Sequence, residues 1–187
     1  YGYDITRVAD ARGRRLPNTI VGTLMRIDLP VPLAPGRSTA FQIDWAYNLV
    51  DTKAMRGRAG FEHFPDDDRE GGNDILLVAQ WFPRMIAYSD YEGWHNKEFL
   101  GRGEFTLEFG NYDVTMNVPN DHIVSSTGVL NNPSAVLTAT QRQRLARARN
   151  ADEPVFIVTP EEAEANEASN PTGSKTWRYT AQNVRDF

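Results

Sequence analysis

Short segments in which apolar side chains stand at every second position recur along this chain. The clearest segment, residues 39–48, has Phe41 and Trp45 among its alternating apolar residues. A period of two is typical of a strand that buries one face. We predict strands here and over residues 19–28, 75–81, 104–109, 113–118, 155–158 and 175–181.

The connection between two of these predicted strands has the length of a hairpin turn. Gly110-Asn111-Tyr112 separates the strands predicted at 104–109 and 113–118, and short connections that contain glycine are typical of hairpins. Parallel strands would require crossover helices, and no amphipathic helix pattern occurs before about residue 137. The predicted fold class is therefore mainly β, an antiparallel sandwich or curled sheet.

Helix signals begin only at residue 138. Thr138 precedes Gln141 by three residues, which is the spacing of a capping box, where each side chain bonds the backbone N–H of the other residue. Thr159 and Glu162 repeat this spacing with a proline between them, at the position that suits the first residue of a helix. We predict two short helices within about 138–168, inserted before the last strand.

The composition excludes several classes of function. A formal net charge of -5 and a pI of about 5.2 argue against a nucleic-acid partner, because such binding depends on clustered lysine and arginine. The chain has no cysteine, so neither a disulfide framework nor a thiolate metal site is possible. No apolar run approaches the roughly 20 residues that a membrane helix needs, and we expect no membrane span in this segment.

Metal ligands are not grouped in any spacing that specifies a site. His63, His95 and His122 have no histidine four residues away, so the helical H-E-x-x-H pattern of zinc peptidases is missing. One possibility is that histidines distant in sequence come together in a composite zinc site. The other is that the three histidines lie on the surface or are hydrogen-bonded in the core. Residues 66–74 bring several carboxylates together in a glycine-containing stretch, and their oxygen atoms could bind calcium. The spacing of these carboxylates differs from that of an EF-hand. The alternative is an ordinary solvated loop.

Four aromatic residues suggest a different kind of site. Trp81, Tyr88, Tyr91 and Trp94 lie close in sequence and could form a platform for sugars or peptides. Packing in a core is the competing explanation, because large aromatic residues dominate protein interiors. If the four residues form such a platform, the chain would be a stand-alone β-sandwich binding module for carbohydrate or peptide.

A longer part of the sequence resembles a known enzyme family. Residues 77–85 (LVAQWFPRM) and the Gly93-Trp94 pair that follows are similar to the zinc aminopeptidases of the aminopeptidase N and leukotriene hydrolase family. Further similar segments follow in the same order at residues 99–105, 112–114, 118–119, 124–130, 175–179 and 183–187. Their order resembles the stretch of the family's N-terminal domain that leads into a thermolysin-like catalytic domain.

This resemblance implies a saddle-like β-sandwich, which agrees with the strand pattern, and a partial N-terminal domain over residues 1–187. The chain starts at Tyr1 without Met, and the catalytic domain with its zinc would follow residue 187. The family's H-E-x-x-H motif, its third Glu ligand and its G-x-M-E-N loop do not occur in this sequence. We therefore expect no catalytic residue, metal or cofactor in this chain, and a zinc metalloaminopeptidase as the parent protein.

The resemblance implies one site residue in this chain. In this family, a Glu or Gln on an N-domain strand projects into the cleft and binds the free α-amine of the substrate, and Gln80 occupies that position. Capture of the ammonium would fix the distance of the first peptide bond from the zinc. A neutral Gln should anchor the amine more loosely than a carboxylate would. The alternative is that Gln80 only satisfies a strand edge.

The expected partners follow from this assignment. They are the catalytic domain of the same protein and the N-terminus of a peptide substrate, with no nucleic acid. The kinship with secreted bacterial enzymes favours a periplasmic or secreted location.

Overall fold

The structure is a computed structural model that describes residues 2–55, 57, 59–65, 72–98, 106–169 and 172–187. The chain forms two compact units, Tyr1–Leu107 and Glu108–Phe187. Strands hold 36% of the described residues and helices 14%, so the chain is mainly β. All pairings between the named strands are antiparallel, which confirms the predicted fold class.

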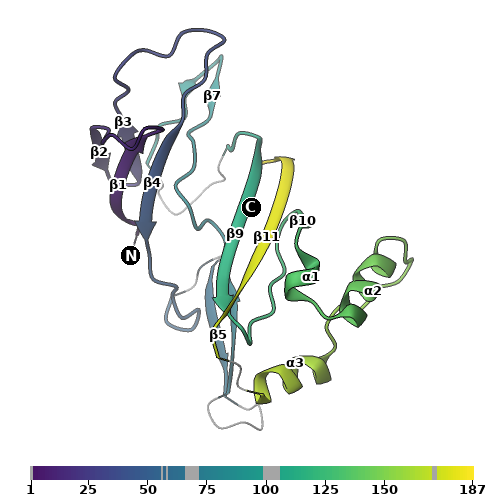
Figure 1. Cartoon of the computed structure of the whole chain (residues 1–187). Coiled ribbons are helices and arrows are strands. Elements are labelled where there is room, and N and C mark those ends of the chain that lie inside the picture. Colours follow the sequence, from purple (N-terminus) through teal and green to yellow (C-terminus); the bar gives the residue numbers. More distant parts are fainter. Residues whose placement is uncertain (1, 56, 58, 66–71, 99–105, 170–171) are drawn as a thin grey trace. The chain divides into compact units, whose positions relative to one another are not determined.

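The first unit consists of paired strands joined by loops (Figure 1). The pairs in its described part are β1 (Asp4–Asp10) with β4 (Phe41–Ala46), β2 (Asn18–Val21) with β3 (Leu24–Ile27), β5 (Gly60–Phe64) with β6 (Asn73–Leu77), and β7 (Tyr88–Ser89) with β8 (Gly93–Trp94). The strand predicted at 39–48 is confirmed as β4. Its partner β1 contributes Val8 and Ala9 to the buried core, with Leu16 and Ala87.

Two predicted strands of this unit differ from the structure. Residues 19–28 form the β2–β3 hairpin rather than one strand, because Gly22 has a φ of 55° and reverses the chain between the paired residues Val21 and Leu24. A left-handed backbone of this kind is readily adopted by glycine. The strand predicted at 75–81 is shorter at its C-terminal end, since β6 stops at Leu77.

The second unit is built on a three-stranded antiparallel sheet (Figure 1). Its strand order is β10 (Val129–Leu130), β11 (Ser174–Val184) and β9 (Gly110–Pro119). The long pair β9–β11 contains the strands predicted at 113–118 and 175–181, and both predictions are confirmed.

The hairpin predicted around Gly110-Asn111-Tyr112 is wrong. These residues belong to β9, where Tyr112 pairs with Ala181 and Gly110 with Val184. Residues 106–109 are not in a strand, and residues 104 and 105 lie outside the described part of the chain. The backbone groups of the expected turn are thus satisfied by β11, a segment about 70 residues away in sequence, which a local pattern does not reveal.

The described part of the second unit contains three helices: α1 (Pro133–Val136), α2 (Ala139–Ala148) and α3 (Pro160–Ala168). The last two confirm the predicted helices, including both capping boxes. The short α1 lies inside the region that was expected to be all β; one turn of helix is too short to show a periodic pattern.

The strand predicted at 155–158 is also wrong, since these residues lie outside every strand. Ile157 instead packs against the core cluster of Val136, Leu137, Trp177 and Tyr179. Its apolar character therefore serves packing rather than strand pairing.

Candidate functional site

Gln80 lies in a bend three residues beyond the end of β6, and not on a strand. Its φ of 52° is in the left-handed region, where residues other than glycine are uncommon. Among the described residues, Asn183 is the other non-glycine residue with a positive φ. The expectation of a strand position for Gln80 is therefore wrong, because this backbone conformation is incompatible with an extended strand.

The bend at Gln80 is held from two other parts of the first unit. The hydroxyl of Tyr3, just before β1, donates a hydrogen bond to the Gln80 carbonyl oxygen. The indole Nε1–H of Trp45, on β4, donates to the carbonyl oxygen of Trp81 at 2.9 Å. The carbonyl groups of Gln80 and of the next residue are thus fixed to the β1–β4 pair.

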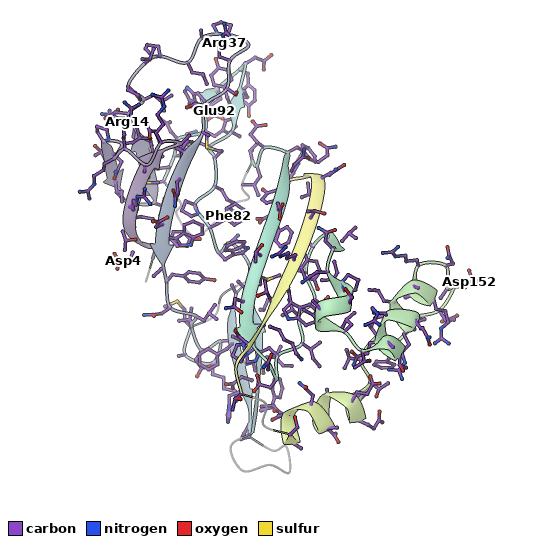
Figure 2. All side chains as sticks on the ribbon, viewed as in Figure 1. Asp4, Arg14, Arg37, Phe82, Glu92 and Asp152 are labelled. Carbon is purple, nitrogen blue, oxygen red and sulfur yellow. The ribbon has the colours of Figure 1, made fainter. Side chains whose placement is uncertain are left out.

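Aromatic packing surrounds these hydrogen bonds. The rings of Trp45 and Trp81 have centroids 6.1 Å apart, and Trp81 meets Phe82 edge-on at 5.0 Å. Phe82 is labelled in Figure 2. The ring of Tyr3 meets that of Tyr47 edge-on at 5.6 Å. These contacts orient both hydrogen-bond donors, Tyr3 and Trp45.

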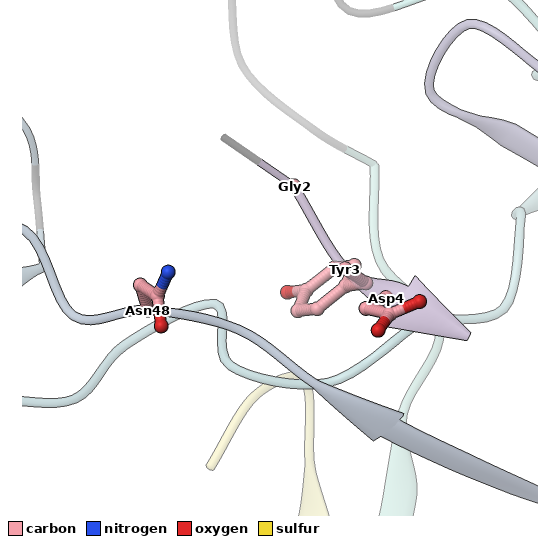
Figure 3. A pocket seen from close by; sticks show the side chains of 4 residues that line it. All are labelled: Gly2, Tyr3, Asp4 and Asn48. Atoms are coloured by element: carbon pink, nitrogen blue, oxygen red, sulfur yellow. The ribbon is translucent and has the colours of Figure 1, made fainter. Parts of the chain in front are cut away.

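A hollow of about 470 Å³ adjoins this bend through Tyr3 (Figure 3). It is lined by Gly2, Tyr3, Asp4 and Asn48, at the end of the pair in which Asp4 lies opposite Ala46. The Asp4 carboxylate and the Asn48 amide oxygen are acceptors that suit an ammonium group. Gln80 itself does not line the hollow; it is joined to it by the hydrogen bond from Tyr3.

Sequence reasoning missed Tyr3, Asp4 and Asn48. Nothing in their local patterns distinguishes them from ordinary polar residues at strand ends. The β1–β4 pairing brings residues 4 and 48 to the same end of a strand pair, across more than 40 positions of sequence. Only a prediction of strand pairing could have found them.

Comparisons with known proteins identify no relative. No protein-family model, curated protein or solved structure matches the chain. The resemblance to zinc aminopeptidases therefore rests on the residues of this sequence alone.

The three histidines each contact a different partner. His63 Nδ1 lies 2.8 Å from Asp74 Oδ1, His95 Nε2 lies 2.8 Å from Ser89 Oγ, and His122 Nδ1 lies 2.8 Å from Asp121 Oδ1. Across the described ranges, no three or more His, Asp or Glu side chains converge as a metal site. Residues 66–71 of the acidic stretch lie outside those ranges, so the calcium hypothesis for 66–74 stays a prediction.

The four aromatic residues differ in their exposure. Trp81 is half-buried against Trp45, as the packing explanation expects. Tyr88 and Trp94 are each 59% exposed and meet edge-on at 5.1 Å, and Tyr91 is 81% exposed. Packing in a core therefore does not account for the three residues of the β7–β8 hairpin.

None of the helices in the described part is long and apolar enough to cross a bilayer.

Proposed function

We propose that this chain is a non-catalytic part of a zinc-dependent aminopeptidase, in which it forms part of the substrate cleft and binds the N-terminal amine of the peptide through Gln80. The observation that carries the proposal is the left-handed bend of Gln80. Tyr3 donates to the carbonyl oxygen of Gln80, and Trp45 donates to that of the next residue, Trp81. A left-handed backbone costs a residue with a Cβ about 1–2 kcal/mol. Such positions persist where the surroundings enforce them, and they cluster at ligand clamps.

The chemistry of the bend suits an ammonium ligand. The Gln80 amide oxygen can accept from the ammonium, and the Asp4 carboxylate in the adjoining hollow adds negative charge nearby. Because Tyr3 contacts both places, it acts as a positioning residue for them. An amine fixed in this way would place the first peptide bond at a set distance from the reacting group.

In this proposal, the zinc and its ligands belong to a catalytic domain outside these 187 residues. The described residues offer no cluster of metal ligands. When bound in that domain, the metal would polarise the scissile carbonyl and activate water. The role of the present chain is limited to orienting the substrate.

Kinetics of the full-length protein test this function. With an aminoacyl anilide as substrate, we expect Gln80→Ala to raise KM and lower kcat, because anchoring serves both binding and alignment. Gln80→Glu should lower KM, since a carboxylate is a stronger acceptor for an ammonium. Gln182→Ala, an exposed glutamine on β11, is the matched control and should leave both constants unchanged. Unchanged kinetics for both Gln80 variants would remove Gln80 from the site.

The second candidate function is a binding module for carbohydrate or peptide, favoured by the exposed Tyr88–Trp94 pair. Exposed aromatic faces are typical surfaces for stacking ligands. Titration of the isolated chain with oligosaccharides, and of Trp94→Ala in parallel, distinguishes the two. Saturable binding that is lost in Trp94→Ala would favour the module over the aminopeptidase proposal.

A further inference from the structure

The segment that joins β1 to β4, residues 11–40, differs in charge from the rest of the chain. It contains five arginines and a single carboxylate, Asp28, so its net charge is +4, whereas the whole chain carries -5. Because Asp10 pairs with Phe41, the segment begins and ends at the same end of the β1–β4 pair. Figure 1 shows it beyond that end, away from the N-terminus. The hollow of the proposed amine site lies at the opposite end, beside Asp4.

The turn after β1 holds three of these arginines on an ordered backbone. The Asp10 carboxylate accepts from the backbone N–H groups of Arg12 and Arg14, each at 2.9 Å, and forms an ion pair with the Arg14 guanidinium at 2.8 Å. Arg15 follows in a β-bridge with Ala9. Arg12 and Arg15 are exposed, and neither forms an ion pair with another described residue. Two guanidinium groups are therefore available to an anionic partner.

Aliphatic side chains are exposed in the same segment. Ile20 and Val21, at the end of β2 beside the hairpin turn, are 53% and 68% exposed. In the loop before β4, Val31 is 71% and Leu33 is 50% exposed. Arg37, labelled in Figure 2, follows in this loop and is also exposed. Basic residues together with exposed aliphatic residues suit an anionic lipid surface, because the cations meet headgroups while the aliphatic groups enter the interface.

Nucleic acid is the other polyanion that these arginines could contact. Single strands stack their bases on aromatic rings, and residues 11–40 contain no aromatic residue. A duplex offers mainly its phosphates to basic residues, and phosphates provide no favourable surface for Ile20, Val21, Val31 and Leu33. The exposed aliphatic groups therefore favour lipid over nucleic acid.

We propose that residues 11–40 bind the surface of an anionic lipid bilayer. The exposed arginines meet phosphate headgroups, and Ile20 and Val21 enter the boundary between headgroups and acyl chains. An arginine close to an anionic surface strengthens binding about fivefold, so a few of them give a weak, reversible and salt-dependent attachment. This surface goes beyond the proposed aminopeptidase function and does not depend on it.

Cosedimentation of the 187-residue chain with vesicles tests this surface. The probe is a vesicle of three parts phosphatidylcholine and one part phosphatidylglycerol, and a vesicle of phosphatidylcholine alone is the control. We expect binding to the anionic vesicle to be about tenfold stronger or more, and to weaken as the ionic strength rises, because salt screens exposed charges. Equal binding to both vesicles would overturn the proposal. Binding to a DNA duplex without binding to the anionic vesicle would also overturn it and assign the segment to nucleic acid.

Two matched double variants locate the charges that matter. Arg12→Gln with Arg15→Gln leaves the Arg14–Asp10 pair in place and should weaken binding to the anionic vesicle about 25-fold, fivefold for each charge. Arg147→Gln with Arg149→Gln removes the same charge from exposed positions of the second unit and should weaken binding clearly less. Equal losses in both double variants would show that net charge, and not this surface, is responsible.

A third double variant tests the aliphatic contact. Ile20→Thr with Val21→Thr keeps β-branched residues in β2 but removes apolar surface, and it should weaken binding about tenfold. Val129→Thr, at a 54% exposed position on β10, is the control and should leave binding unchanged. Unchanged binding in the β2 double variant contradicts the entry of this hairpin into the bilayer interface.

Discussion

At the scale of single residues, Gln80 combines a costly backbone conformation with partners distant in sequence. Its hydrogen-bond donor Tyr3 is 77 positions away, and its neighbour Trp81 is held by Trp45 from another strand. The resemblance indicated Gln80 as a site residue, but its left-handed bend could not be predicted, because Gln has no preference for that conformation. A contact between positions 3 and 80 leaves no trace in a local pattern.

The backbone of Gln80 gives a prediction about stability. Gln80→Gly should raise the free energy of unfolding by about 1 kcal/mol, because glycine adopts a left-handed φ without the Cβ penalty. Asn183→Gly, at a φ of 55°, is the control; its gain should be smaller because asparagine tolerates this region better. Urea unfolding measures both. A loss of stability in Gln80→Gly would show that its side-chain contacts outweigh the backbone cost.

At the scale of elements, the agreement between sequence and structure depends on how local the determining interactions are. The helices α2 and α3 were predicted with their caps because Thr138 and Thr159 bond residues three positions away. The extent of β9 was missed because it depends on pairing with the distant β11. The β2–β3 hairpin was missed because a single turn residue, Gly22, divides one continuous apolar pattern.

The caps give a second prediction. Thr138→Ala and Thr159→Ala should each lower the free energy of unfolding by about 1 kcal/mol, since each removes the acceptor for a backbone N–H in the first turn. The Thr→Ser variants keep the hydroxyl and should stay close to wild type. Chemical denaturation followed by circular dichroism checks the set. Equal effects of Ala and Ser would show that the hydroxyls are not what stabilises these helices.

Glu162, in the capping box of α3, should make the stability of the fold depend on pH. The hydrogen bond from the Thr159 backbone N–H, aided by Arg144 and Gln141, lowers the pKa of Glu162 below its ordinary value of 4.5. A lowered folded-state pKa means that the ionised form stabilises the fold above pH 4.5. This contribution is lost as the pH falls from there through the folded-state pKa.

Glu162→Gln tests this dependence because the amide keeps the capping geometry without the charge. The variant should be less stable than wild type at pH 7, and the difference should narrow as the pH falls below 4.5. Urea unfolding over a pH series measures the difference. Glu164→Gln, on the same helix outside the cap, should not show this narrowing. If the difference in the free energy of unfolding between wild type and Glu162→Gln stays constant with pH, the ionised Glu162 carboxylate is not what stabilises the cap.

At the scale of the whole molecule, the candidate site for the amine lies in one of the two compact units, the first, which contains Gln80 and the hollow at Tyr3. The fold class was predictable because apolar residues alternate along a strand whichever strand it pairs with. The composition of the site was not predictable, because the site joins residues from segments far apart in the sequence.

The isolated chain should bind no stoichiometric zinc and should not cleave an aminoacyl anilide. The physical reason is that its sequence lacks the H-E-x-x-H pattern that places two imidazoles and a general base on one metal. Metal analysis after dialysis against zinc, together with an anilide assay, checks both statements. Zinc near one per chain would contradict this part of the account.

The most direct test of the central claim asks whether Gln80 and the substrate amine interact. In the full-length protein, the affinity of a non-hydrolysable peptide is measured by calorimetry with a free and with an acetylated N-terminus, in wild type and in Gln80→Ala. We predict that acetylation weakens binding about tenfold or more in wild type and clearly less in Gln80→Ala, because the contact between Gln80 and the amine is already lost in the variant. An equal effect of acetylation in both proteins would show that Gln80 does not bind the amine.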